Sequence, residues 1–334
     1  MNLRLSILDQ SPIISGYTPA RAVEETLKLA QAAEALGYHR YWLAEHHAVA
    51  ALADPCPEIL LTRVASATTR IRVGTGGVLL PYYSALKVAE VFRMLEALFP
   101  GRIDLGLGRA PGGDMLTAQA LSNGSYSAAD HFPQQVQDLV AFLDHRLPAD
   151  HAYASVTAMP AGSTAPPVWL LGSSDYSGAL AAALGLRFAF AHFISAQGGD
   201  AVMRAYKQRF VAAERDRAPH AILCAFVICA ETAAQAQKLA ACVDLRRLRM
   251  AQGLDLPIPT VEEAQAQTYS ARELAYVQSQ RARLVIGTAR EVRERLLQLR
   301  VQFDADEVMV LTVIGDYAKR LRSYELLARE FELQ

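Results

Sequence analysis

Titratable side chains and glycines follow a series of short apolar runs in this sequence of 334 residues. These groups are Asp9-Gln10, Glu45-His46-His47, Thr75-Gly76-Gly77, Gly108-Arg109, Gly172-Ser173-Ser174, His192 and Thr312. Such groups support proton transfer, anion binding and the close approach of a ligand to the backbone. If the apolar runs are parallel strands that close into a barrel, their carboxyl ends share one face and bring these groups together.

His46 is the candidate for proton transfer. An imidazole with an unperturbed pKa of about 6.5 can take up or release a proton near neutral pH, and Glu45 or His47 can orient it. A metal site is disfavoured, because adjacent side chains of a strand point to opposite faces and no third ligand stands at a suitable spacing. Taken alone, a single histidine at a strand end is also typical of a hydrogen-bonded structural group.

Arg109 and the turn of Gly172, Ser173 and Ser174 are candidates for anion binding. A guanidinium is planar and always charged, so it can hold two oxygens of a phosphate. The serine turn precedes a predicted helix, whose amino end offers backbone N–H groups to an anion. The alternative roles are a surface arginine and ordinary helix caps.

Two further pairs stand at predicted strand ends. Gly76 and Gly77 allow close approach to the backbone, or they mark a strand bulge. Asp9 and Gln10 are candidates for lining a substrate pocket, together with His47. An aspartate beside a Ser-Pro pair is as often a turn former.

The elements that would position these groups alternate between strand and helix along the chain. The predicted strands are 3–9, 38–44, 71–80, 102–108, 168–172, 187–193, 221–230 and 306–312. The predicted helices are 18–36, 57–69, 84–98, 133–146, 175–185, 199–216 and 315–332. This order predicts a (β/α)8 TIM barrel and a single domain over 1–334, with a mostly helical insertion at about 231–301 before the last strand.

A doubly wound open sheet is the main alternative to the barrel. That fold normally shows a glycine fingerprint after its first strand, where this chain has DQSPIISG. The segment GLGRAPGG at 106–113 has Pro111 in place of the last glycine of G-x-G-x-x-G, and no Walker-type phosphate loop occurs. The barrel is therefore favoured.

Composition excludes several classes of protein. The formal net charge is −1 and no cluster of Lys and Arg occurs, which argues against partners such as nucleic acid or a membrane surface. Four scattered cysteines do not form a disulfide framework or a zinc site. The absence of a signal peptide and of an apolar run of 18 residues predicts a soluble, cytoplasmic protein.

Five collinear segments resemble the luciferase-like flavin monooxygenases. They are YWLAEHH (41–47), IRVGTGGVLLP (71–81), FPGRIDLGLGRAPGG (99–113), VWLLGSS (168–174) and VIGTAREVRERL (285–296). The opening LSILDQSPI, with GLGRAPGG, indicates a subgroup of luciferase-like oxidoreductases whose substrates are largely unassigned. The resemblance covers almost the whole chain.

The resemblance implies roles for the groups at the strand ends. Arg109 would bind the phosphate of FMN with the turn of Gly172, Ser173 and Ser174, and a second hydroxyl would come from Tyr176 or Ser177. Gly76 and Gly77 would form a non-prolyl cis peptide bond beneath the flavin ring. His46 would lie near the reactive edge of the flavin and take part in proton transfer, with Glu45 beside it.

The function that the resemblance implies is oxygenation of a small organic substrate with reduced FMN and dioxygen. The sequence has no nicotinamide fingerprint, so NAD(P)H would act indirectly through a flavin reductase. The substrate pocket would be completed by the insertion and by the loop at 110–130. A homodimer is expected, formed through the helices at 57–69 and 84–98. Two alternatives stay open: an oxidoreductase that transfers hydride with a deazaflavin, and a non-catalytic flavin-binding protein.

Overall fold

A computed structural model of the chain describes residues 3–122, 130–162, 164–195 and 197–334. Within these residues, eight parallel strands close into a barrel, because β10 pairs with both β1 and β8. The barrel strands are β1 (Arg4–Asp9), β2 (Arg40–Leu43), β3 (Arg72–Thr75), β5 (Ile103–Gly108), β6 (Val168–Gly172), β7 (Arg187–Ala191), β8 (Ala221–Ala230) and β10 (Glu307–Leu311). The predicted TIM barrel is confirmed.

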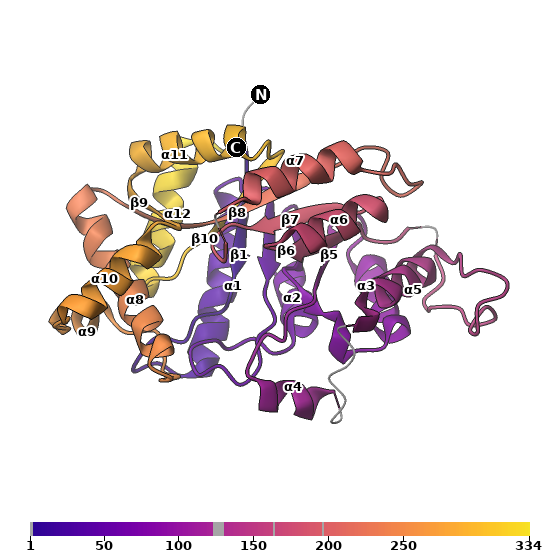
Figure 1. Ribbon diagram of the computed structural model, residues 1–334, viewed down its shortest axis with the longest axis horizontal. Coiled ribbons are helices and arrows are strands. Elements are labelled where there is room, and N and C mark those ends of the chain that lie inside the picture. Colours follow the sequence, from indigo (N-terminus) through magenta and orange to yellow (C-terminus); the bar gives the residue numbers. More distant parts are fainter. Residues whose placement is uncertain (1–2, 123–129, 163, 196) are drawn as a thin grey trace.

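Helices follow the strands and cover the outside of the barrel (Figure 1). They are α1 (Pro19–Ala35), α2 (Pro57–Ser66), α3 (Ala85–Leu98), α5 (Phe132–Asp144), α6 (Asp175–Ala183), α7 (Gly199–Arg209), α11 (Ala289–Gln302) and α12 (Tyr317–Glu330). Local signals set their starts: the Thr18 side chain caps α1 with Pro19 at its first position, and Thr288 forms a capping box with Glu291 at α11.

Alternation along the strands sorts the buried side chains into two layers. Outward residues such as Ile7 and Leu105 pack against the helices in one hydrophobic cluster. Inward residues such as Leu8, Trp42 and Trp169 fill the barrel in a second cluster. The two indole rings meet edge to face at 5.3 Å between centroids. The barrel interior is therefore a packed core, and chemistry is confined to its ends.

A buried guanidinium closes the amino end of the barrel. Arg40, 2 % exposed, donates from Nη1 to Asp104 Oδ2 (2.7 Å) and from Nε to Glu307 Oε1 (2.7 Å). Its Cζ atom lies 5.0 Å from the centroid of the Trp169 ring. Burial alone would raise the pKa of Glu307, but the charge of Arg40 and the hydrogen bonds that the carboxylate accepts together outweigh it and lower that pKa to about 2. One side chain thus joins β2, β5 and β10.

The structure corrects two predicted elements and adds a third. The predicted strand 71–80 is divided at Gly76-Gly77 into β3 and β4 (Val78–Leu79), followed by the short helix η1 (Leu80–Tyr82). A helix that was not predicted, α4 (Met115–Leu121), follows β5. The predicted helix 199–216 ends at Arg209, because the chain then turns back so that Val211 N can donate to Ala182 O (2.9 Å).

The region 231–301 is mostly helical, as predicted, and it also contains a strand that was not predicted. Its helices are α8 (Ala233–Ala251), α9 (Val261–Ala266), α10 (Ala271–Arg281) and α11, and its strand is β9 (Leu284–Thr288). β9 pairs in parallel with the second half of β8, residues 226–230. The run LVIGT is short and lies directly between two helices, so the sequence pattern alone does not identify it as a strand. Helices α8, α9 and α10 stand together on one side of the barrel (Figure 1).

The segment between α8 and α9 folds over the carboxyl ends of the first strands. Ile258 N donates to Ile13 O (2.8 Å), and Asp255 Oδ2 accepts from Ala50 N (2.8 Å). The insertion therefore forms one wall of the face on which the strands end, which we call the mouth. Part of the predicted pocket loop at 110–130, residues 123–129, lies outside the described residues.

In the described part of the chain, no helix is long and apolar enough to cross a membrane.

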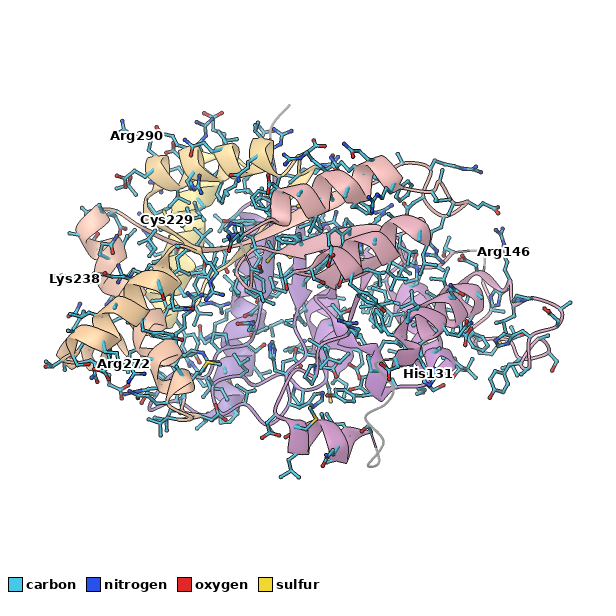
Figure 2. All side chains as sticks on the ribbon, in the orientation of Figure 1. His131, Arg146, Cys229, Lys238, Arg272 and Arg290 are labelled. Atoms are coloured by element: carbon cyan, nitrogen blue, oxygen red, sulfur yellow. The ribbon has the colours of Figure 1, made fainter. Side chains whose placement is uncertain are left out.

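Replacing Arg40 should destabilise the barrel strongly. Arg40→Met leaves Glu307 without its guanidinium partner in a fully buried position. We expect a loss of about 3–5 kcal/mol in the free energy of unfolding, measured by urea denaturation. The control is Arg146→Met, which removes an exposed ion pair with Glu214 at the periphery (Figure 2) and should cost about 1 kcal/mol or less. Equal losses in the two variants would contradict a central role for Arg40.

Candidate active site

Glu45 organises the residues that follow β2. Its buried carboxylate accepts a hydrogen bond from Tyr83 Oη at Oε1 (2.7 Å) and one from Leu79 N at Oε2 (2.9 Å). The ring nitrogen Nε2 of His47 also lies 2.7 Å from Glu45 Oε1. The carboxylate therefore holds His47 and Tyr83 in fixed positions at the mouth.

The segment 109–113 is fastened to the same strand end. His47 N donates to Gly112 O (3.1 Å), and Tyr82 Oη donates to Pro111 O (2.7 Å). A Cβ atom on Gly113 would lie 2.7 Å from His47 O, so only glycine permits this approach. These contacts explain why the RAPGG segment needs glycine at position 113, and they fix the backbone that carries Arg109.

Arg109 and Tyr176 are brought together from neighbouring strand ends. Arg109 follows β5 and is exposed, and its Cζ atom lies 4.1 Å from the centroid of the Tyr176 ring at the start of α6. This is the distance of a cation–π contact, which holds the guanidinium plane beside the amino end of that helix.

The serines predicted to bind an anion lie next to this pair. Ser173 and Ser174 join β6 to α6, and Ser177 lies in the first turn of that helix, where its hydroxyl packs against Gly172. Within the described residues, none of these three hydroxyls has a hydrogen-bond partner, and Ser174 does not cap α6 with its side chain. Asp175 Oδ1 accepts from Tyr176 N (2.8 Å), so one carboxylate also stands at this helix start.

The peptide bond between Gly76 and Gly77 is cis, as the family resemblance implied. A Cβ atom on Gly76 would lie 2.6 Å from Leu8 Cδ1, and one on Gly77 would lie 2.7 Å from Gly106 O. The protein's own packing therefore requires glycine at both positions. Their contact with a cofactor stays a prediction.

His46 is less basic than the sequence suggested. Burial, reinforced by the positive charge of Arg246, lowers the pKa of His46 from 6.5 to about 4. Its Nδ1 atom is buried and has no hydrogen-bond partner in the described part of the chain. At neutral pH the imidazole is uncharged, so it can accept a hydrogen bond or a proton at the mouth.

Asp9 lies in a buried network at the end of β1. Its Oδ1 atom accepts from Arg320 Nη2 (2.6 Å) and from Ser11 N (2.8 Å), and Tyr41 donates to its other oxygen. These partners occupy the carboxylate, which is fully buried. Gln10 follows and is half-buried. The roles of Asp9, Gln10 and His47 in a substrate pocket stay predictions.

Two residues that the sequence analysis did not identify also lie here. Asp54 is 3 % exposed, and its Oδ2 atom has no partner among the described residues, while its backbone oxygen accepts from His46 N (3.0 Å). Burial, with the charges of Asp9 and Glu58, raises the pKa of Asp54 to about 7. Arg246 on α8 has a buried Nη1 atom that likewise lacks a partner. In sequence, Asp54 resembles a turn former and Arg246 an ordinary helical residue.

No group of three or more His, Cys, Asp and Glu side chains in the described ranges is arranged to hold a metal ion.

The model of the luciferase-like monooxygenase family matches residues 2–306. The chain is 46 % identical to the protein YwcH of Bacillus subtilis (strain 168), over 98 % of both chains. It is 36 % identical to the N-acetyl-S-alkylcysteine monooxygenase of the same organism, over 98 % of this chain and 97 % of the relative. The crystal structure of apo-MsnO8 superposes with a TM-score of 0.92 at 41 % identity, covering 100 % of this chain and 98 % of that one.

Asp54 should make the stability of the protein depend on pH. The folded state keeps its proton up to a pH of about 7, whereas the unfolded chain releases it near 3.8. Stability from this group is therefore complete below pH 3.8 and is lost as the pH rises through 7. Asp54→Asn removes this loss. When the pH is raised from 4 to 8, the free energy of unfolding of the variant, relative to that of wild type, should therefore rise by about 1–3 kcal/mol.

The control for this prediction is Asp150→Asn, which changes an exposed carboxylate. Chemical denaturation of the three proteins between pH 4 and pH 8 tests it. A parallel pH dependence for wild type and Asp54→Asn would show that the Asp54 carboxyl does not titrate as described.

Proposed function

The chain belongs to the luciferase-like monooxygenase family, and on this premise we propose that it is a flavin-dependent monooxygenase that uses reduced FMN and dioxygen to oxygenate a small organic substrate. The observation that supports FMN most is the stacking of Arg109 on Tyr176 beside three serine hydroxyls that have no protein partner among the described residues. These are donors suited to a phosphate at the rim of the mouth.

The donor set fits a phosphomonoester. Arg109 offers a planar fork of N–H groups, and Tyr176 holds that plane from one side. Ser173, Ser174 and Ser177 offer hydroxyls at the start of α6, where the amino end of a helix favours an anion. An anion there neutralises Arg109, which forms no ion pair in the described part of the chain. The carboxylate of Asp175 is directed to the amide of Tyr176.

The remaining residues of the mouth serve the reaction by position and by charge. Reduced FMN, when bound, supplies the electrons that activate dioxygen. His46 stays neutral and can accept a proton beside the cofactor. Glu45 keeps His47 and Tyr83 fixed through its hydrogen bonds, which makes it a positioning residue.

The supply of reduced flavin is assigned to a separate protein. The sequence contains no nicotinamide fingerprint, so we infer that NAD(P)H acts through a flavin reductase. A related protein acts on N-acetyl-S-alkylcysteine, as its name states, which supports a small organic substrate for this chain. Deazaflavin-dependent hydride transfer and flavin binding without catalysis are the alternatives that the reaction with oxygen separates.

We also propose that two copies of the chain form a homodimer. Exposed apolar side chains gather on α2, α3 and the loop before β6, namely Ile59 (68 % exposed), Met94 (51 %), Leu98 (55 %) and Met159 (55 %). They line one groove, on the two helices from which the sequence analysis predicted the dimer. A second copy of the chain would remove this surface from water.

Removing the Arg109 guanidinium should weaken FMN binding. Arg109→Ala takes away a charge-assisted pair with the phosphate, so we expect the dissociation constant to rise by about 10- to 100-fold, equivalent to about 1.5–3 kcal/mol. Titration of the protein with FMN, followed by flavin fluorescence, measures this change. The control is Arg290→Ala, because Arg290 is exposed on α11 away from the mouth (Figure 2). Unchanged affinity in Arg109→Ala would remove Arg109 from the phosphate site.

A charge in the apolar groove should separate the two subunits. Met94→Glu places a carboxylate in the predicted interface, so we expect the mass measured by light scattering to fall from that of a dimer to that of a monomer. Val301→Glu is the matched control, because Val301 is 80 % exposed on α11. A wild type that is already monomeric, or a Met94→Glu variant that stays dimeric, would exclude this interface.

A further inference from the structure

Arg246 occupies a position on α8 that faces the barrel. Leu239 and Val243, seven and three residues earlier, belong to the buried cluster that also contains the interior residues of the barrel. Positions with this spacing share one face of a helix, so Arg246 continues that face by one turn toward the mouth. Its side chain is half-buried.

The guanidinium of Arg246 differs from those of its neighbours in its partners. Arg247 Nη1 donates to Gln280 O (2.9 Å), and Arg249 pairs with Glu263 (3.9 Å). Arg246 Nη1, in contrast, is buried and has no hydrogen-bond partner in the described part of the chain, where Arg246 also forms no ion pair. A buried donor without a partner costs free energy unless a ligand supplies one.

The groups near Arg246 do not neutralise its positive charge. Asp255 acts on it electrostatically, but that carboxylate accepts a hydrogen bond from Ala50 N (2.8 Å) and makes no ion pair with the arginine. His46 also interacts electrostatically with Arg246, and its Nδ1 atom is likewise buried and without a hydrogen-bond partner within the described ranges. Two unpartnered polar atoms, one from the segment after β2 and one from α8, therefore belong to the same part of the mouth.

We propose that Arg246 binds a carboxylate of the substrate, so that this enzyme acts on small organic acids. The inference rests on the proposed monooxygenase function and adds the class of substrate to it. A carboxylate gives the buried Nη1 its missing acceptor and neutralises the guanidinium. It also fixes one end of the substrate on the insertion, beside His46, while the phosphate of the cofactor is assigned to Arg109 and α6.

The test compares acids with their neutral amides. Butyrate, hexanoate and benzoate are titrated by calorimetry into the FMN-loaded protein, each against the corresponding amide. Wild type should bind at least one acid about tenfold or more tightly than its amide, as expected for a charge-assisted hydrogen bond. Arg246→Met should abolish this preference, and Arg246→Lys should keep part of it because the charge is retained.

Controls separate this inference from the proposed function. Arg249→Met, one turn away on α8, should keep the full preference for acids, and FMN affinity should be the same in all variants. FMN binding by wild type without a preference for any acid, or a preference that survives in Arg246→Met, would overturn the carboxylate site and leave the monooxygenase proposal standing. A loss of FMN affinity in Arg246→Met would assign the guanidinium to the cofactor instead. A wild type that binds no FMN would defeat the proposed function and this inference together.

Discussion

The ion pairs of Arg40 with Asp104 and Glu307 are the constraint on which the rest of the structure depends. They join three strands at the amino end of the barrel, where all three charged side chains are almost completely buried. Above them, Trp42 and Trp169 fill the interior. With its amino end closed by charge and its centre filled by apolar side chains, the barrel can hold functional groups at its other end only, and there the strand ends present them.

At the mouth, polar groups are fixed by bonds to neighbouring strand ends. Glu45 holds residues from two segments, and the backbone of 109–113 is fastened to His47. In contrast, the hydroxyls of the serines before α6 and the Nη1 atom of Arg246 have no hydrogen-bond partner in the described part of the protein. This contrast between rigid support and unused donors is what a binding site requires: the first fixes geometry, and the second is left for ligands.

The sequence predicted the barrel because each strand and helix carries its own local signals, from the Thr18 cap to the apolar runs. It also predicted which groups lie at the mouth, since this depends on strand order alone. It could not predict that the strand β9 lies between α10 and α11, because its five residues are set by pairing with β8. Nor could it predict the low pKa of His46 or the buried, unpartnered Nη1 atom of Arg246, which depend on burial and on an electrostatic interaction between residues 200 positions apart.

In the proposed function, this barrel binds reduced FMN and brings it to react with oxygen. Anaerobic titration of the protein with reduced FMN, followed by rapid mixing with oxygenated buffer, tests it most directly through the absorbance of the flavin. We predict saturable binding, and reoxidation of the bound flavin in two kinetic phases that free reduced FMN does not show. The claim would be contradicted if no reduced FMN bound, or if the bound flavin were reoxidised in a single phase as in free solution.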